Sequence, residues 1–418
     1  MYKQSFFIIF IQLIGIILGF LSIYLVAGDM GPDVYSLVGV YTVVSGVVLT
    51  FSHLGVESTM MRETLFWKEK GDYEKIKEYT MQSILSRMIG FFVLTPFIIA
   101  YLCFMSITKY NGGYWVLLIS FFIGSCASAL NDSMSLIIRS QGGFVFSQFA
   151  KTLNNTITKF IAIFVYLEFG SLPYLYFYAL FPLPLMVIFV FKLRGCIDFG
   201  YLSFKGTVTK IKESKNLWLK SYLDYFSASA DSLLVTIIFP ASVIGVYTLY
   251  KNLEVIAKGF IEGFFDVLTQ KLVQFKGNVL KLLTMENKLN KVRWVVISLI
   301  IIISIVFLFN SSFFIHLINL QKYERADLVI LCVLAVSALY LVGKNEINII
   351  SLFAPSKIVL DFGFLVFIVT LLSFGLVIGW PSIYGVLFQR VIIFLVTSIA
   401  AIHLLNKNRL LFYSGIYK

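Results

Sequence analysis

Continuous apolar runs of roughly 20 residues recur along the whole chain of 418 residues. A run of about 20 apolar residues forms a helix long enough to cross the ~30 Å hydrocarbon core of a bilayer. Only 13% of the residues are charged and the mean hydropathy is +0.89, whereas a soluble domain is typically about 25% charged. The sequence therefore predicts an all-α polytopic membrane protein with about twelve transmembrane helices. The predicted spans are 5–27, 34–56, 83–107, 114–138, 146–169, 171–191, 218–239, 243–265, 294–317, 328–350, 358–379 and 381–404.

The loops between these spans differ sharply in basic residues. One set of alternate loops, together with both termini, holds nearly all the loop Lys and Arg, while the opposite set holds only Lys109, Lys322 and Arg325. Basic loops remain in the cytoplasm, so both termini are predicted to be cytoplasmic. The formal net charge of +12 is then mostly a signal of topology and gives no reason to expect nucleic acid.

Two short motifs recur at an offset near 210 residues and suggest a duplication. VYSL at 34–37 and VYTL at 246–249 open the second and eighth predicted spans, and Pro-x-x-Tyr at 173–176 and 381–384 opens the sixth and twelfth. Six spans per half place both halves in the same orientation, which is a parallel repeat. We therefore predict two six-helix lobes.

The lobes are predicted to comprise residues 1–205 and 206–418.

Two stretches resemble a known family of transporters. GPDVYSLVGVYTVVSGVVLTFSHLGVESTMMRE at 31–63 and ADSLLVTIIFPASVIGVYTLYKNLEVIAKGF at 230–260 are similar to Wzx-type flippases (O-antigen transporters) of the multidrug/oligosaccharidyl-lipid/polysaccharide (MOP) superfamily. The resemblance implies MATE-like bundles around a central cavity that opens alternately to the two sides of a bacterial inner membrane. It also implies an undecaprenyl-diphosphate-linked glycan as substrate, and a polysaccharide polymerase and a chain-length regulator as partners beside the membrane lipid.

Charged side chains inside the predicted spans are the candidate functional groups, because each costs about 2.5–3.5 kcal/mol to insert and normally faces a cavity or a partner. Their spacing of three or four residues places them in stripes on the fifth, seventh and eighth spans. The predicted substrate-cavity residues are Arg87, Lys151, Asn155, Lys159, Lys220, Lys251, Lys258 and Arg390. The residues predicted for coupling or ion pairing are Asp132, Asp224, Asp231, Glu254 and Glu262.

These groups allow more than one interpretation. Lys and Arg can hold a lipid diphosphate, but ion pairing such as Glu254 with Lys258 could instead only neutralise a stripe. Lys220 and Lys344 lie near span ends, where snorkelling to the interface is the alternative. A buried carboxylate could couple transport to a proton or sodium gradient, and no cofactor or metal is expected.

Two other functions compete with a flippase. A drug/cation antiporter of the same superfamily would be expected to concentrate acids in one lobe, whereas here acids and bases are matched over both halves. A membrane glycan polymerase would need a catalytic outer loop, but the longest predicted one has about ten residues, 318–327. The sequence G-x-x-x-x-G-K-[ST] does not occur, which argues against direct use of ATP.

Overall fold

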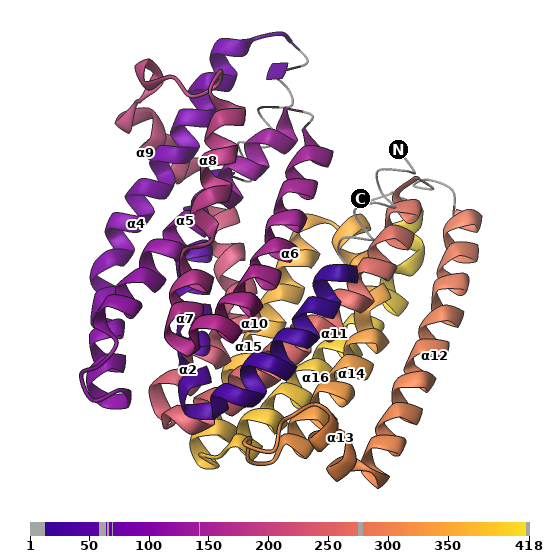
Figure 1. Ribbon diagram of the computed structural model, residues 1–418. Helices are drawn as coiled ribbons and strands as arrows, with labels where there is room; N and C mark the ends of the chain where they lie inside the picture. Colours follow the sequence, from indigo (N-terminus) through magenta and orange to yellow (C-terminus); the bar gives the residue numbers. More distant parts are fainter. Residues whose placement is uncertain are drawn as a thin grey trace. The chain divides into compact units, whose positions relative to one another are not determined.

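The structure is a computed structural model, and it describes residues 13–57, 64, 67–68, 70–141, 143–274 and 279–414. All regular elements in this part of the chain are helices (Figure 1). They form two compact units, each of which takes its residues from two separate stretches of the chain. Unit 1 comprises Met1–Ser22 and Asp33–Ala241, and unit 2 comprises Ile23–Pro32 and Ser242–Lys418.

The described residues confirm a multi-pass membrane protein with about twelve spans. Eight helical segments are long and apolar enough to cross a membrane, and the first of them, Leu13–Phe51, contains a kink between two helices at Gly31. The φ of Gly31 is 74°, a left-handed conformation that glycine adopts without steric cost. Three further long helices coincide with the predicted charged spans: α6 (Phe144–Phe169), α10 (Lys215–Ile238) and α11 (Ala241–Gln274).

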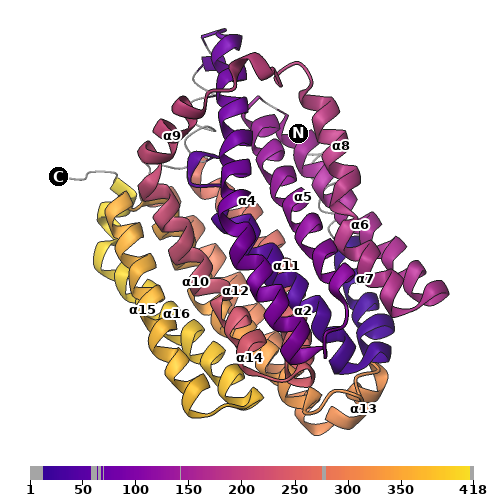
Figure 2. The same ribbon diagram turned by 90° about the vertical axis from the view of Figure 1, so that its left-hand side faces the viewer.

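Unit 1 is organised around α5 (Trp115–Ser140), which packs against α4 (Tyr73–Lys109), α6, α7 (Ser171–Leu180) and α8 (Pro182–Leu193) (Figure 2). At its contact with α7, Gly124 approaches the main chain so closely that an added Cβ would lie 1.9 Å from the carbonyl oxygen of Ala179. The sixth predicted span is broken at Phe181, directly before Pro182, where α7 ends and α8 begins. Besides these helices and α10, the unit contains most of α2 (Gly28–Phe51), η2 (Phe199–Tyr201) and α9 (Phe204–Glu213).

Unit 2 is organised around α14 (Ala326–Phe353), which packs against α12 (Val279–Phe309) and α16 (Ile383–Ser414), while α15 (Ser356–Gly379) packs on α16 (Figure 2). Its core contains the fully buried side chains of Leu282, Leu341, Ile349 and Leu405, which come from three of these helices. Burial of such side chains is the main favourable contribution to the packing. The helices of the unit are η1 (Ile23–Ala27), α11, α12 (Val279–Phe309), α13 (Ser311–Leu317), α14 (Ala326–Phe353), α15 (Ser356–Gly379) and α16 (Ile383–Ser414).

The segment Ile23–Pro32, which joins the first two spans, belongs to unit 2. The hydroxyl of Tyr323 donates to the carbonyl of Ala27 at 2.8 Å, and Nζ of Lys322 donates to the carbonyl of Asp29 at 2.5 Å. The compact units therefore divide at positions 22/23, 32/33 and 241/242. The boundary at 205/206 concerns the duplicated halves and stays a prediction.

The repeated motifs VYSL and VYTL occupy comparable places in their helices. Each follows a proline near the start of a long helix, Pro32 in α2 and Pro240 just before α11. Tyr35 and Tyr247 are both buried. The placement of both motifs at the beginning of a span agrees with the sequence analysis.

Candidate functional site

A cavity of about 250 Å³ lies within unit 1, between α2, α5, α6 and the α7–α8 break. Its walls carry hydroxyl, amide and aromatic groups, and Lys151 is the only charged residue among the described ones that line it. The lining residues are Tyr41, Ser128, Asn131, Lys151, Asn154, Asn155, Thr158, Tyr178, Phe181, Pro182 and Leu185.

Helix α6 contributes the largest polar part of this wall. Lys151, Asn155 and Thr158 are separated by four and three residues, so they project from one face of the helix. Lys151 and Asn155 were both predicted to line a cavity. Lys159 was also predicted there, but it is not among the lining residues; it lies about 80° around the helix from Lys151, and its Nζ donates to the carbonyl of Gly15 at 3.0 Å.

The charge of Lys151 is compensated at the cavity wall. Its ammonium group forms a hydrogen-bonded ion pair with the carboxylate of Asp132 on α5. The two side chains are 30% and 37% exposed, so the pair is accessible from outside the protein interior. Asp132, a predicted coupling residue, is thereby placed beside the cavity.

Asn131 lines the same cavity and has a fixed orientation. Its Nδ2 donates to the carbonyl of Pro182 at 2.7 Å, and because a carbonyl only accepts, the amide cannot be turned around. The residue is 4% exposed, and its Oδ1 has no hydrogen-bond partner among the described residues. A buried acceptor without a partner is uncommon and needs an explanation.

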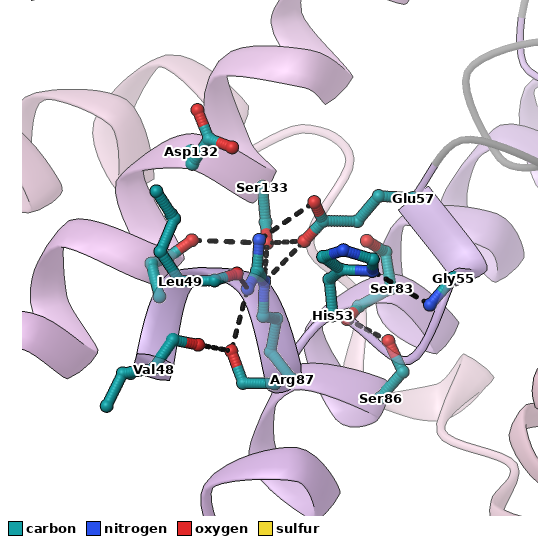
Figure 3. A network of polar contacts seen from close by, with 12 residues as sticks. Val48, Leu49, His53, Gly55, Glu57, Ser83, Ser86, Arg87, Asp132 and Ser133 are labelled. Carbon is teal, nitrogen blue, oxygen red and sulfur yellow. Dashed lines mark hydrogen bonds and ion pairs between the residues drawn. The ribbon is translucent and has the colours of Figure 1, made fainter. Parts of the chain in front are cut away.

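Arg87 lies in a separate, fully buried network rather than in this cavity (Figure 3). Its Nε and Nη2 donate to Oε1 and Oε2 of Glu57 at 2.5 and 2.9 Å, and its Nε also reaches Oγ of Ser133 at 2.8 Å. Its Nη1 donates to the carbonyl of Leu49 at 2.6 Å and to Oγ of Ser52 at 2.7 Å. With these donors occupied, Arg87 joins α2, α4 and α5 as a structural clamp.

Glu57 was not among the predicted candidates. It directly follows the apolar run 34–56, so hydropathy places it in a loop. The available signal was Arg87 itself, since a buried guanidinium requires a carboxylate partner from a neighbouring helix.

A second ion cluster lies in unit 2 and centres on Glu254 of α11. Nη2 of Arg390, on α16, donates to Oε1 of Glu254 at 2.8 Å. Lys258 forms a hydrogen-bonded ion pair with the same oxygen, and Nζ of Lys251 lies 3.9 Å from Oε2. Three predicted cavity cations therefore surround a single carboxylate, and the formal charge of these four groups is +2.

The lysines of this cluster differ from the arginine in accessibility. The side chains of Lys251 and Lys258 are 17% and 19% exposed, whereas that of Arg390 is only 2% exposed. The ammonium of Lys258 also lies 4.0 Å from the ring centroid of Phe394 and 5.2 Å from that of Tyr340. Cation–π contacts of this kind help to hold a lysine charge away from bulk water.

Another buried pair in unit 2 was missed by the sequence analysis. Nη1 of Arg293, on α12, donates to both carboxylate oxygens of Glu346 on α14, at 2.7 and 2.6 Å. Arg293 directly precedes the predicted span 294–317, so hydropathy places it in a loop. Both boundary residues, Glu57 and Arg293, show that the helices bury charges just beyond their apolar runs.

The remaining candidates are on α10 and at the far end of the α11 stripe. Asp231 is 2% exposed and accepts from the backbone N–H of Ser232 at 2.9 Å. The side chains of Lys220, Asp224 and Glu262 lie outside the described residues. Their proposed places in the cavity or in coupling stay predictions.

The fold matches that of solved transporters over nearly the whole chain. An inward-facing multidrug resistance MATE family transporter of the MOP superfamily is 15% identical, with a TM-score of 0.68 over 97% of this chain and 95% of that chain. An outward-facing structure of such a transporter is 16% identical, with a TM-score of 0.59 over 98% and 96%. A MOP superfamily transporter from Pyrococcus furiosus, described as having a binding pocket of reverse polarity, is 14% identical, with a TM-score of 0.52 over 98% and 96%.

The helical architecture and these likenesses define a multi-pass membrane protein with a MATE-like fold. Residues 1–269 match the family described as polysaccharide biosynthesis protein, and the chain belongs to this family. No curated protein matches the sequence significantly. Family and fold together place the chain among the transporters of the MOP superfamily, as the resemblance of 31–63 and 230–260 had implied.

Proposed function

We propose that the protein flips an undecaprenyl-diphosphate-linked oligosaccharide, an O-antigen or other surface polysaccharide repeat unit, from the cytoplasmic to the outer leaflet of a bacterial inner membrane. Membership of the polysaccharide biosynthesis family supports a glycan as the cargo. The observation that carries the proposal is the cluster of three cations around Glu254 within the helices of unit 2.

The charge of this cluster suits an anionic lipid headgroup. A diphosphate brings about two negative charges, and Lys and Arg side chains bind phosphate oxygens by charge-assisted hydrogen bonds. Arg390 is buried and holds Glu254, so the two partly exposed lysines, Lys251 and Lys258, are the groups that can reach a ligand. The prenyl chain would remain in the lipid while the headgroup crosses.

The alternative is a drug/cation antiporter, which the likeness to multidrug MATE transporters favours. A cationic drug would require a carboxylate that is open to it. Glu254 is 2% exposed and enclosed by three cations, so it is poorly placed for that task. A membrane glycan polymerase is the third and weakest candidate, because the fold is that of transporters.

The proposal also covers the transport mechanism, the topology and the partners. We propose alternating access driven by an ion gradient, with Asp132 and Asp231 as the described carboxylates that could carry a proton. Both termini are proposed to be cytoplasmic, and a polysaccharide polymerase and a chain-length regulator would act on the delivered repeat unit.

The test uses purified protein in proteoliposomes with a fluorescent undecaprenyl-diphosphate oligosaccharide in one leaflet. Wild-type protein should expose the labelled glycan to a membrane-impermeant quencher, Lys258→Ala should lose this activity, and Lys258→Arg should retain part of it. Lys357→Ala, at an exposed lysine of α15, is the matched control and should behave as wild type. Full activity of Lys258→Ala would refute the role of the cluster, and transport of a cationic dye in place of the glycolipid would favour the antiporter.

A further inference from the structure

We infer that the cavity of unit 1 is a subsite for one uncharged sugar ring, built separately from the cationic cluster that would hold a diphosphate. This inference rests on the proposed function, because it specifies how the glycan part of the same substrate would be bound. Four features of the cavity carry it: its charge balance, its mixture of donors and acceptors, its broken helix and its shape.

The cavity is electrically balanced. Among the described residues, Lys151 is the only charged one that lines it, and Asp132 neutralises that lysine through a direct ion pair. A phosphate site would need an excess of positive charge, as the cluster around Glu254 has. The unit 1 cavity therefore matches a ligand without net charge.

The polar lining both donates and accepts hydrogen bonds. The side-chain amides of Asn154 and Asn155 and the hydroxyls of Ser128, Tyr41 and Tyr178 each combine the two functions. Sugar hydroxyls also donate and accept, so each can be matched. An ionised phosphate only accepts and would leave the acceptors of this wall without partners.

Asn131 gives a further reason to expect a sugar hydroxyl rather than a phosphate. Its Nδ2 is committed to the carbonyl of Pro182, which leaves its buried Oδ1 as an acceptor that requires a donor. Leaving a buried acceptor unpaired costs about 1–3 kcal/mol. Because Oδ1 is enclosed, a ligand hydroxyl could supply the missing donor only after a shift of the side chain toward the cavity, whereas a phosphate oxygen would repel Oδ1.

The broken helix adds further acceptors beside the cavity. Pro182 and Pro184 have no N–H, so the carbonyls of Tyr178 and Leu180 cannot receive their usual bond from the residue four positions later. Tyr178, Phe181 and Pro182 all line the cavity. Helix breaks at membrane depth are tolerated where the freed backbone faces a polar cavity, and in transporters such breaks form substrate sites.

The dimensions favour a single ring. The volume of about 250 Å³ lies below the roughly 300–1,000 Å³ of pockets for drug-sized ligands. The rings of Tyr41 and Tyr178 meet edge to face, with centroids 5.5 Å apart and planes at 73°. They give the cavity an apolar wall on which the C–H face of a sugar ring can be buried while its hydroxyls meet the amides.

The experiment measures binding of soluble probes to the full-length protein in detergent by saturation-transfer NMR and calorimetry. The probes are a panel of neutral methyl glycosides (gluco, galacto, manno, rhamno and the two common N-acetylhexosaminides) and inorganic pyrophosphate. At least one glycoside should bind wild-type protein, and Asn155→Ala should weaken that binding at least tenfold without changing the affinity for pyrophosphate. Asn155 is exposed, so its removal should leave the fold intact.

Two further variants complete the test. Asn131→Leu should also weaken glycoside binding, and Asn310→Ala, at an exposed asparagine of unit 2, is the control that should leave both affinities unchanged. Absence of glycoside binding, unchanged binding in Asn155→Ala, or loss of pyrophosphate binding in Asn155→Ala would each overturn the inference. Glycoside binding that needs Asn155 in a protein that fails to flip the glycolipid would refute the proposed function and leave the sugar subsite standing.

Discussion

Nη2 of Arg390 lies 2.8 Å from Oε1 of Glu254, which ties α16 to α11 within unit 2. The carboxylate is also the partner of Lys258, so one buried acid organises cations from two helices. Its counterpart in unit 1, the Lys151–Asp132 pair, joins one acid to one base at a cavity wall. The two units thus carry different local charges, and this difference underlies the division between diphosphate and sugar proposed above.

The first prediction concerns the carboxylate at the centre of the cluster. Glu254→Gln removes the carboxylate that pairs with Lys251, Lys258 and Arg390. Removing one partner of a buried ion pair costs about 3–5 kcal/mol, so thermal unfolding of the solubilised protein should shift to a clearly lower temperature. The double variant Glu254→Gln with Arg390→Gln should recover part of the loss, and a single variant as stable as wild type would contradict the prediction.

The second prediction tests the Arg87–Glu57 clamp by a double-mutant cycle. Both side chains are buried, and each single variant, Arg87→Met or Glu57→Leu, should lose about 3–5 kcal/mol because it strands the other charge. The double variant should lose much less than the sum of the two, as expected for groups in direct contact. Additive losses, measured by chemical denaturation in the same detergent, would show that the two residues act independently.

The fold could be predicted largely from the sequence, because membrane insertion imposes a strong and simple pattern. Apolar runs gave the span count, and Gly31 and Pro182 are chemically suited to the breaks found at those positions. What could not be predicted was the membership of the compact units. The segment Ile23–Pro32 packs with unit 2 because of tertiary contacts, such as the hydrogen bond between Tyr323 and Ala27. No local sequence pattern encodes such contacts.

The candidate site could be predicted only in part. Helical spacing correctly grouped Lys251, Glu254 and Lys258, because residues three and four apart share a helix face. Helical spacing cannot distinguish a residue that lines a cavity from one in a buried ion pair. Arg87 was predicted to line the substrate cavity, but it lies in a buried network. The role of Asn131 was missed for a related reason: an uncharged amide inside a span gives no signal until its partners are known.

A third prediction concerns the close approach of α5 and α7. In Gly124→Ala the new methyl group would meet the carbonyl of Ala179, so the helices must separate, at a cost of about 1–3 kcal/mol for overpacking. The same change in Gly363→Ala on α15 meets no atom within 4 Å and should leave stability unchanged or raise it slightly, since alanine favours helix. Thermal unfolding of the two variants should therefore move in different directions, and equal shifts would argue against tight α5–α7 packing.

A fourth prediction concerns topology. Reporter fusions that follow Lys70, Lys205 and Lys288 should all indicate the cytoplasm, because these positions lie in the basic loops that remain inside. A fusion after Lys322, in the opposite set of loops, should indicate the outer side and serves as the internal control. A single cytoplasmic position that reports outside would require a different number of spans.

The last prediction tests the attachment of Ile23–Pro32 to unit 2. Tyr323→Phe removes the hydroxyl that donates to the carbonyl of Ala27 and keeps the buried ring, so the cost should be about 0.5–1.5 kcal/mol. Hydrogen–deuterium exchange should increase in the peptide that covers residues 23–32, because their anchor to unit 2 is weakened. Tyr73→Phe, at an exposed tyrosine of α4, is the matched control and should leave this peptide unchanged. If Tyr323→Phe leaves exchange at 23–32 as in wild type, the hydroxyl does not hold the segment in place.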